Sequence, residues 1–212
     1  MNELRFTLLS DGSSDRALMP LLERLLQEHK EEVAWQPEYA DLRRLPRPPK
    51  GLAARIETTL HRYPCELLFV HRDAEKESPE HRKSEIDKAL AQLEPGTPPP
   101  VVCVIPVRMQ EAWLLVSETA LRRAAGNPNS TEPLELPRLS QLENEPDPKA
   151  ILHASLKEAS GLRGARRKRF PVHERVHRVA DHIEDLTSLR QLSAFQRLEQ
   201  DLLEVLERIR ME

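Results

Sequence analysis

Acidic residues follow three short apolar runs in the first half of the chain. The runs are residues 6–9, 67–70 and 101–105, and the acids that follow them are Asp11 and Asp15, Asp73 and Glu75, and Glu111. If the runs are parallel strands, their carboxyl ends meet at one edge of a sheet, where open α/β sheets bind their ligands. Carboxylates a few ångströms apart repel one another, so such a cluster usually holds a cation. The sequence therefore predicts a divalent metal site at this edge.

Oxygen ligands in this number are typical of Mg²⁺ or Mn²⁺ and not of zinc. Residues two apart in an extended segment point to the same side, so Asp73 and Glu75 are both expected to reach one ion. The alternative is that these two are solvated turn residues, while Asp15 and Glu111 only stabilise helix N-termini. A phosphotransfer receiver domain also clusters acids at strand ends, but it needs a lysine after a later strand, and this chain has Arg108 there.

The elements that must position these acids alternate along the chain. Hydrophobic patterns predict strands at 4–9, 33–39, 67–70 and 101–107 and helices at 18–26, 52–62, 79–93 and 111–125. This alternation predicts an α/β fold with a mainly parallel sheet and flanking helices. Residues 126–146, rich in Pro and Asn, read as a boundary, and Asp147-Pro148 reads as a helix start. We expect an α/β domain over 1–125, a loop over 126–146 and a helical C-terminal extension over 147–212, packed on the same domain.

Composition limits the class of protein. The 212 residues include 32% charged and only 4% aromatic side chains, so an aliphatic core and a heavily charged surface are expected. Cys65 and Cys103 lie beside strand-like runs and read as buried reduced thiols. No signal peptide and no apolar run of about 20 residues is present, which predicts a soluble cytoplasmic protein without a membrane partner. His71 is expected to be a strand-end packing residue, with a proton shuttle as the alternative.

Three segments resemble the motifs of Toprim domains. Residues 10–15, Ser-Asp-Gly-Ser-Ser-Asp, resemble the Glu-Gly-x-x-Asp/Glu opening, and residues 71–75, His-Arg-Asp-Ala-Glu, resemble the Asp-x-Asp motif. Residues 106–115 resemble the Glu-Ala-Trp-Leu-Leu segment of a Toprim-like family known as domain of unknown function 4276, and the similarity extends to residues 189–198. The order of the three motifs supports the resemblance. Asp11 stands where Glu is usual, and Glu75 where Asp is usual.

This resemblance implies a Toprim-like fold and a Mg²⁺- or Mn²⁺-dependent nucleic-acid phosphodiesterase, related to overcoming-lysogeny-defect-type nucleases. The implied catalytic residues are Asp11, Asp73 and Glu75, and the implied metal ligands are these three with Glu111 and Asp15. DNA is expected as the substrate more than RNA. The resemblance also implies an ATPase partner and a role in defence against phage, and it leaves a homo-oligomer open. The alternative function is a catalytically weak subunit that binds nucleic acid or a partner protein.

A dense basic run lies in the C-terminal part of the chain. It consists of Arg163, Arg166, Arg167, Lys168 and Arg169. Such a run suits contacts with the phosphates of nucleic acid, which supply affinity without sequence readout. The alternative is a solvated loop or a partner for the chain's own acids. Only one aromatic residue accompanies the run, so a platform that stacks single-stranded bases is not expected.

The next segment contains a rival motif. Residues 173–177 read His-Glu-Arg-Val-His, a pattern that binds Zn²⁺ on a helix in metalloproteases, with Glu174 as general base. The usual third ligand is missing, because residue 183 is Ile where the extended pattern has His. The cationic flanks also disfavour another cation. A zinc protease is therefore the weaker alternative, and a helix with a solvated histidine pair is the simpler interpretation.

Overall fold

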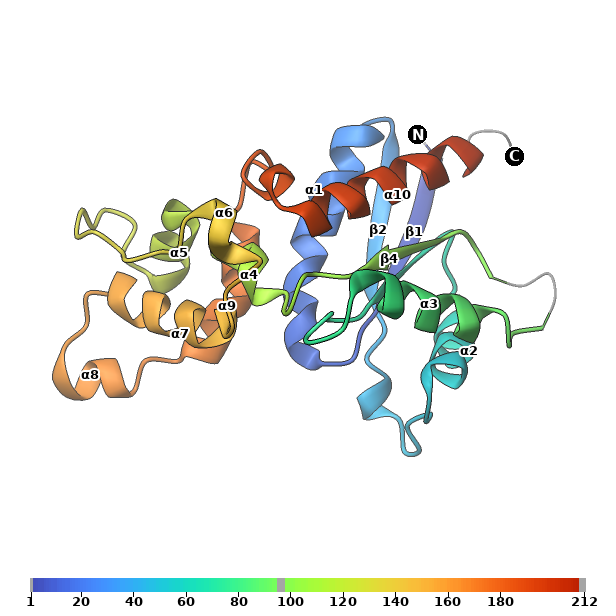
Figure 1. Cartoon of the computed structure of the whole chain (residues 1–212), viewed down its shortest axis with the longest axis horizontal. Coiled ribbons are helices and arrows are strands. Elements are labelled where there is room, and N and C mark those ends of the chain that lie inside the picture. The colour runs from blue at the N-terminus through green and yellow to red at the C-terminus, as the bar shows by residue number, and fades with distance from the viewer. Residues whose placement is uncertain (1, 95–97, 210–212) are drawn as a thin grey trace. The chain divides into compact units, whose positions relative to one another are not determined.

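Four parallel strands form one sheet (Figure 1). The structure is a computed structural model that describes residues 2–94 and 98–209. The strands are β1 (Asn2–Leu9), β2 (Val33–Tyr39), β3 (Leu67–His71) and β4 (Val101–Val104), in the order β2-β1-β3-β4. The α/β class with a parallel sheet, predicted from the sequence, is confirmed.

The pairing of β1, β3 and β4 brings their carboxyl ends together. Leu9 pairs with Val70, and His71 pairs with Val104. Every residue of β3 is buried, as expected for a strand inside a parallel sheet with both faces covered. The residues that follow β1 and β3 therefore lie beside each other at one edge of the sheet.

Helices cover the sheet within a first compact unit, which comprises the described residues up to Ile105 and from Arg197 onward. Its helices are the 3₁₀ turns η1 (Ser13–Leu18) and η2 (Leu42–Arg44), and α1 (Met19–His29), α2 (Leu52–Arg62), α3 (Pro79–Leu90) and most of α10 (Ser193–Ile209). One core cluster joins Leu68 and Val70 of β3 to Ile56 of α2 and Ile86 of α3. These contacts bury the aliphatic core that the composition predicts.

Ion pairs attach α10 to the rest of the first unit. Glu199 lies 2.8 Å from His29 at the end of α1, and Asp201 lies 3.0 Å from Lys83 of α3. None of the described helices combines the length and the apolar character that a membrane span requires.

A second compact unit, residues 106–196, is built from helices. They are α4 (Glu111–Leu114), α5 (Glu118–Ala125), α6 (Leu139–Leu142), α7 (Pro148–Ala159), α8 (Gly164–Lys168), α9 (Val172–Asp181) and the 3₁₀ turn η3 (Leu189–Gln191). Helices α5, α7 and α9 pack against one another. The buried rings of Trp113 and Phe195 meet edge to face, with centroids 5.3 Å apart.

The division of the chain differs from the predicted one. The first unit ends at Ile105 and resumes at Arg197, so the predicted boundary over 126–146 falls inside the second unit. The helix expected over 111–125 is two helices, because Ser117 is extended and its Oγ accepts the N–H of Ala120 to start α5. Composition indicates where turns occur but not which helices pack together. The division into compact units depends on this packing.

The two cysteines are free thiols, as expected, but they are only half-buried. Burial is still the main influence on both side chains, and it raises the pKa of Cys65 and raises that of Cys103 to about 11. Neither cysteine is positioned as a reactive thiolate.

Candidate functional site

A tight turn after β1 places the first acidic side chain of the site. Gly12 precedes η1, and its N–H donates to Asp15 Oδ2 at 2.7 Å. A Cβ at Gly12 would come within 3.2 Å of the Asp15 carboxylate, so this turn favours glycine. The Tyr39 hydroxyl donates to the Gly12 carbonyl at 2.6 Å and holds the turn against β2. Asp15 is thereby buried, with 5% of its surface exposed.

His71, the last residue of β3, lies between two carboxylates. Its Nδ1 is 3.4 Å from Asp15 Oδ2, and its Nε2 is 3.3 Å from Asp73 Oδ1. These contacts are longer than the 2.7–2.9 Å usual for charge-assisted hydrogen bonds. The His71 side chain is 1% exposed, Asp15 7% and Asp73 23%. Of the three groups, only Asp73 offers substantial surface to solvent.

The two carboxylates keep the imidazole charged. Burial alone would lower the pKa of His71, but the contacts with Asp15 and Asp73 outweigh burial and raise the pKa to about 9. Burial alone would likewise raise the pKa of Asp15, but the contact with His71 and the hydrogen bonds from Gly12 and Ser14 lower it. The site at neutral pH is therefore an imidazolium between two carboxylates. The packing role expected for His71 is present, but it comes with a charge.

Arginines surround this buried core and hold the first predicted catalytic residue. Arg55 Nη1 pairs with Asp11 Oδ1, and Arg72 Nε lies 2.9 Å from Asp11 Oδ2. Arg43 donates to the backbone carbonyl of Asp11 at 2.8 Å. Asp11 thus lies at the predicted edge, but both of its carboxylate oxygens face guanidinium groups.

The network continues along the start of α3. Arg72 and Arg82 both approach Glu85, at 3.5 Å and 3.0 Å. Arg82 also donates to the Asp73 carbonyl at 3.1 Å, and its Nη2 lies 3.7 Å from Glu75 Oε2. Guanidinium and carboxylate groups therefore alternate around Asp73. Arg82 contacts both Asp73 and Glu75.

Glu75 does not continue the strand. Strand β3 ends at His71, and Glu75 has φ +55°, a left-handed conformation that non-glycine residues rarely adopt. The same-side geometry expected for Asp73 and Glu75 requires an extended chain, so that expectation fails at this turn. The Glu75 side chain is 68% exposed and faces Arg82.

Glu111 lies in the second unit. It is the first residue of α4, it is only 3% exposed, and its Oε1 lies 3.3 Å from Lys149 Nζ of α7. The structure thus gives this acid a lysine neighbour within its own unit. Its predicted role as a supporting metal ligand stays a prediction.

Several of the side chains predicted to bind Mg²⁺ or Mn²⁺ contact other groups in the structure, and the metal site stays a prediction. Within residues 2–94 and 98–209, no three His, Cys, Asp or Glu side chains form a group able to hold a metal ion. Asp11 is held by Arg55 and Arg72, and Asp15 accepts hydrogen bonds from its own turn. Asp73 is therefore the one predicted ligand that combines exposure with a position beside the buried histidine.

The basic run forms the short helix α8 and its flanks. All five of its cationic residues are exposed, and none pairs with an acid in the described part of the chain. The run is a helix rather than the loop considered as its alternative. Phe170, the aromatic residue beside it, is buried with 8% exposure. The run therefore offers charge and no stacking surface.

The zinc-protease motif falls on the exposed side of α9. The His173 ring packs edge to face on His153 of α7, with centroids 5.0 Å apart, and His177 is exposed. Within the described residues, no group of three metal-ligating side chains lies here either. This arrangement matches the simpler interpretation of the motif.

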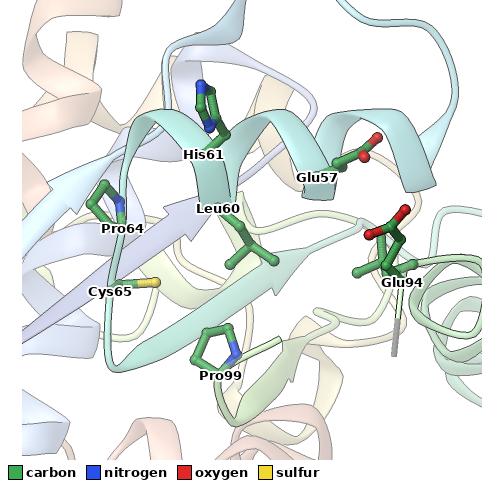
Figure 2. Close-up of a pocket in the computed structure, with 8 residues that line it drawn as sticks. Glu57, Leu60, His61, Pro64, Cys65, Glu94 and Pro99 are labelled. Carbon is green, nitrogen blue, oxygen red and sulfur yellow. The ribbon is translucent and has the colours of Figure 1, made fainter. Parts of the chain in front are cut away.

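A separate cavity lies at the opposite end of β3 from Asp73 (Figure 2). It has a volume of about 430 Å³ and is lined by residues before β3 and β4, at the end of α2 and after α3. Figure 2 shows Leu60 and the Cys65 sulfur turned toward it, with the Glu57 and Glu94 carboxylates at one end. None of the acids predicted to bind metal lines this cavity.

Four arginines of the site were not predicted from the sequence. They contact its acids or backbone although they come from different elements, namely Arg43 of η2, Arg55 of α2, Arg72 just after β3 and Arg82 of α3. Arg72 could have been found, because it lies inside the His-Arg-Asp-Ala-Glu segment. Arg55 and Arg82 carry no local signal, since only the fold brings their helices to this edge.

The fold and this edge together define an α/β protein with a buried Asp–His–Asp cluster at the carboxyl ends of parallel strands. Comparisons with models of protein families, with curated proteins and with solved structures found no match.

Proposed function

We propose that the chain is a nucleic-acid phosphodiesterase whose reaction takes place at the carboxyl edge of β1 and β3. The observation that carries the proposal is His71, buried and in contact with Asp15 on one side and Asp73 on the other. Burying charged groups costs desolvation free energy. Ionisable groups with perturbed pKa values are often found at functional sites. The edge is also where open α/β sheets bind ligands.

In this proposal Asp73 is the general base. It is the most exposed of the three groups, so it can accept a proton from the water that attacks phosphorus. His71 and Asp15 are positioning residues, because they contact the carboxylate or its imidazole partner and are closed to solvent. Their charges fix the direction in which the Asp73 carboxylate points.

The arginines are proposed to bind the phosphate. Guanidinium groups match phosphate oxygens with paired N–H donors and stabilise the charge that develops as the bond to the leaving oxygen breaks. Arg55 and Arg72 now face Asp11, so binding would exchange one anionic partner for another. Such an exchange avoids leaving a half-buried cation without a counter-charge.

The requirement for Mg²⁺ or Mn²⁺, the ATPase partner and the role in phage defence stay predictions. A cleavage assay with titrated metal tests the first of these, and the same assay with an added ATPase tests the second. A phage challenge of cells that express the chain tests the third. DNA is the first substrate to test, as plasmid and as linear duplex, followed by RNA.

The test is the Asp73→Asn variant, which keeps the size of the side chain and removes its basicity. We expect the cleavage rate to fall roughly 10²- to 10⁴-fold, as is usual when a general base is lost. The matched control is Glu38→Gln, which removes an exposed acid from β2 of the same sheet. Equal rates for the two variants would refute the proposed role of Asp73.

A second candidate function is a binding subunit without cleavage activity. The specific observation in its favour is that Asp11 and Glu75, two of the three predicted catalytic acids, already face arginines. Under this alternative, nucleic acid is retained but not cut under any metal condition. The same assay, run with a binding measurement, separates the two functions.

A further inference from the structure

The helix before the basic run, α7, carries a row of two lysines and a histidine. Lys149, His153 and Lys157 are each four residues apart, so they lie along one side of this helix. The row spans about 12 Å, a length over which duplex DNA carries about seven phosphate charges. The next helix in the chain is α8, which carries the exposed run (Figure 1).

A ring contact joins this row to α9. His153 and His173 meet edge to face with an interplanar angle of 89°. Helix α8 and its flanks, which carry the five exposed cations, connect α7 to α9, and these two helices touch through the two histidines. We define the row and the run together as the cationic strip.

The local field along the strip is positive. Burial is the largest influence that lowers the pKa of His153. His173, Lys149 and Lys157 lower it further, and Asp147 raises it by less. Two exposed acids, Glu158 and Glu174, directly follow Lys157 and His173, and they project about 100° around their helices from those residues. Among the described residues, Lys149 is the one member of the strip with an anionic partner, the buried Glu111.

No aromatic ring of the second unit is available for stacking. Trp113, Phe170 and Phe195 are 1%, 8% and 0% exposed. Proteins that hold single strands usually stack bases on exposed rings, so the strip is suited to phosphates and not to bases. A duplex presents its phosphates on the outside and its bases stacked within, which matches this chemistry.

We propose that the cationic strip of α7, α8 and α9 binds the sugar-phosphate backbone of duplex DNA without reading its sequence. The inference deepens the proposed function, because it rests on nucleic acid being the substrate. It assigns Lys157 and His153 of α7, which the sequence did not single out, to the same surface as the basic run.

The test measures binding by fluorescence anisotropy, with a labelled duplex of about 20 base pairs in EDTA over a range of salt concentrations. Each phosphate contact contributes about 0.9 to the slope of log affinity against log salt. For Lys157→Gln we expect a slope lower by about 1 and an affinity roughly 3- to 10-fold weaker. Lys157→Arg should restore both values.

The matched control is Lys88→Gln, which removes an exposed lysine from α3 of the first unit. It should bind as the unmodified chain does. If Lys157→Gln binds like this control while its melting temperature is unchanged, the proposal is overturned. Equal affinity for a single strand of the same length would also contradict it.

The two proposals fail in distinguishable ways. A duplex that is bound through the strip but never cut leaves this inference intact and contradicts hydrolysis at Asp73. If the duplex is cut at the normal rate and Lys157→Gln does not change its binding, hydrolysis at Asp73 is supported. Duplex binding by the cationic strip is then contradicted.

Discussion

The first unit pairs its charges within the chain, and the second unit leaves many of its charges open to solvent. At the sheet edge, Asp11 faces Arg55 and Arg72, and His71 lies between two carboxylates. In α8 and its flanks, five cations are exposed and have no acidic partner among the described residues. The ion pairs at the sheet edge hold their side chains in fixed orientations, as a catalytic site requires. The unpaired cations of the run are suited to binding a polyanionic partner.

The largest effect on binding is expected from the α8 run itself. Replacing Arg166, Arg167 and Lys168 together by Gln should weaken duplex binding roughly 10- to 100-fold and lower the salt slope by about 3. These side chains are exposed, so the fold should be unaffected. Anisotropy titrations check the affinity, and cleavage at saturating DNA checks that the rate is preserved. A large loss of rate at saturation would mean that the two regions are not separable.

A smaller effect is expected on stability, because the contribution of His71 to the free energy of unfolding depends on its charge. Its pKa is about 9 in the folded chain and 6.5 when unfolded, so its contribution is complete below about pH 6.5 and is lost as the pH rises through 9. The pKa of Asp15 is lowered by folding, so its contribution is lost only in acid, below its usual 3.8.

Thermal melts between about pH 6 and about pH 10 test this linkage. The melting temperature of His71→Gln should lie several degrees below that of the unmodified chain near pH 6, and the difference should shrink toward pH 10. A difference that stays constant across this range would show that His71 is neutral in the folded protein and only packs.

The smallest effect concerns the histidine pair of the second unit. Because His173 is one of the groups that lower the pKa of His153, the His173→Gln variant should raise that pKa while burial keeps it below 6.5. An NMR titration of the His153 ring measures this directly. A pKa that does not move would argue against a shared positive field along the strip.

Local signals in the sequence predicted most of the elements. The bounds of β2 and α2 agree with the predicted ranges, and α2 is a regular run with an apolar period and a turn on its flank. Helix α7 begins as predicted, with the Asp147 side chain accepting the N–H of Ala150 at 2.9 Å. The four-residue helix α6 has no comparable signal and was not predicted.

The candidate site was only partly predictable. Strand order brings Asp11, Asp15 and Asp73 to the expected edge, since parallel strands align their carboxyl ends. The positive φ of Glu75 and the arginines from α2 and α3 depend on tertiary packing, which periodicity does not encode. Glu111 follows β4 in sequence, yet the chain enters its second unit at Pro106, before this acid is reached.

The most direct test of the account measures binding and cleavage of one labelled duplex by three proteins. These are the unmodified chain, Asp73→Asn and Lys157→Gln. We expect Asp73→Asn to bind with unchanged affinity and to cut roughly 10²- to 10⁴-fold more slowly. Lys157→Gln should bind more weakly and cut at the normal rate once saturated. Cleavage by Asp73→Asn at the rate of the unmodified chain would contradict the central claim that the sheet edge performs the reaction.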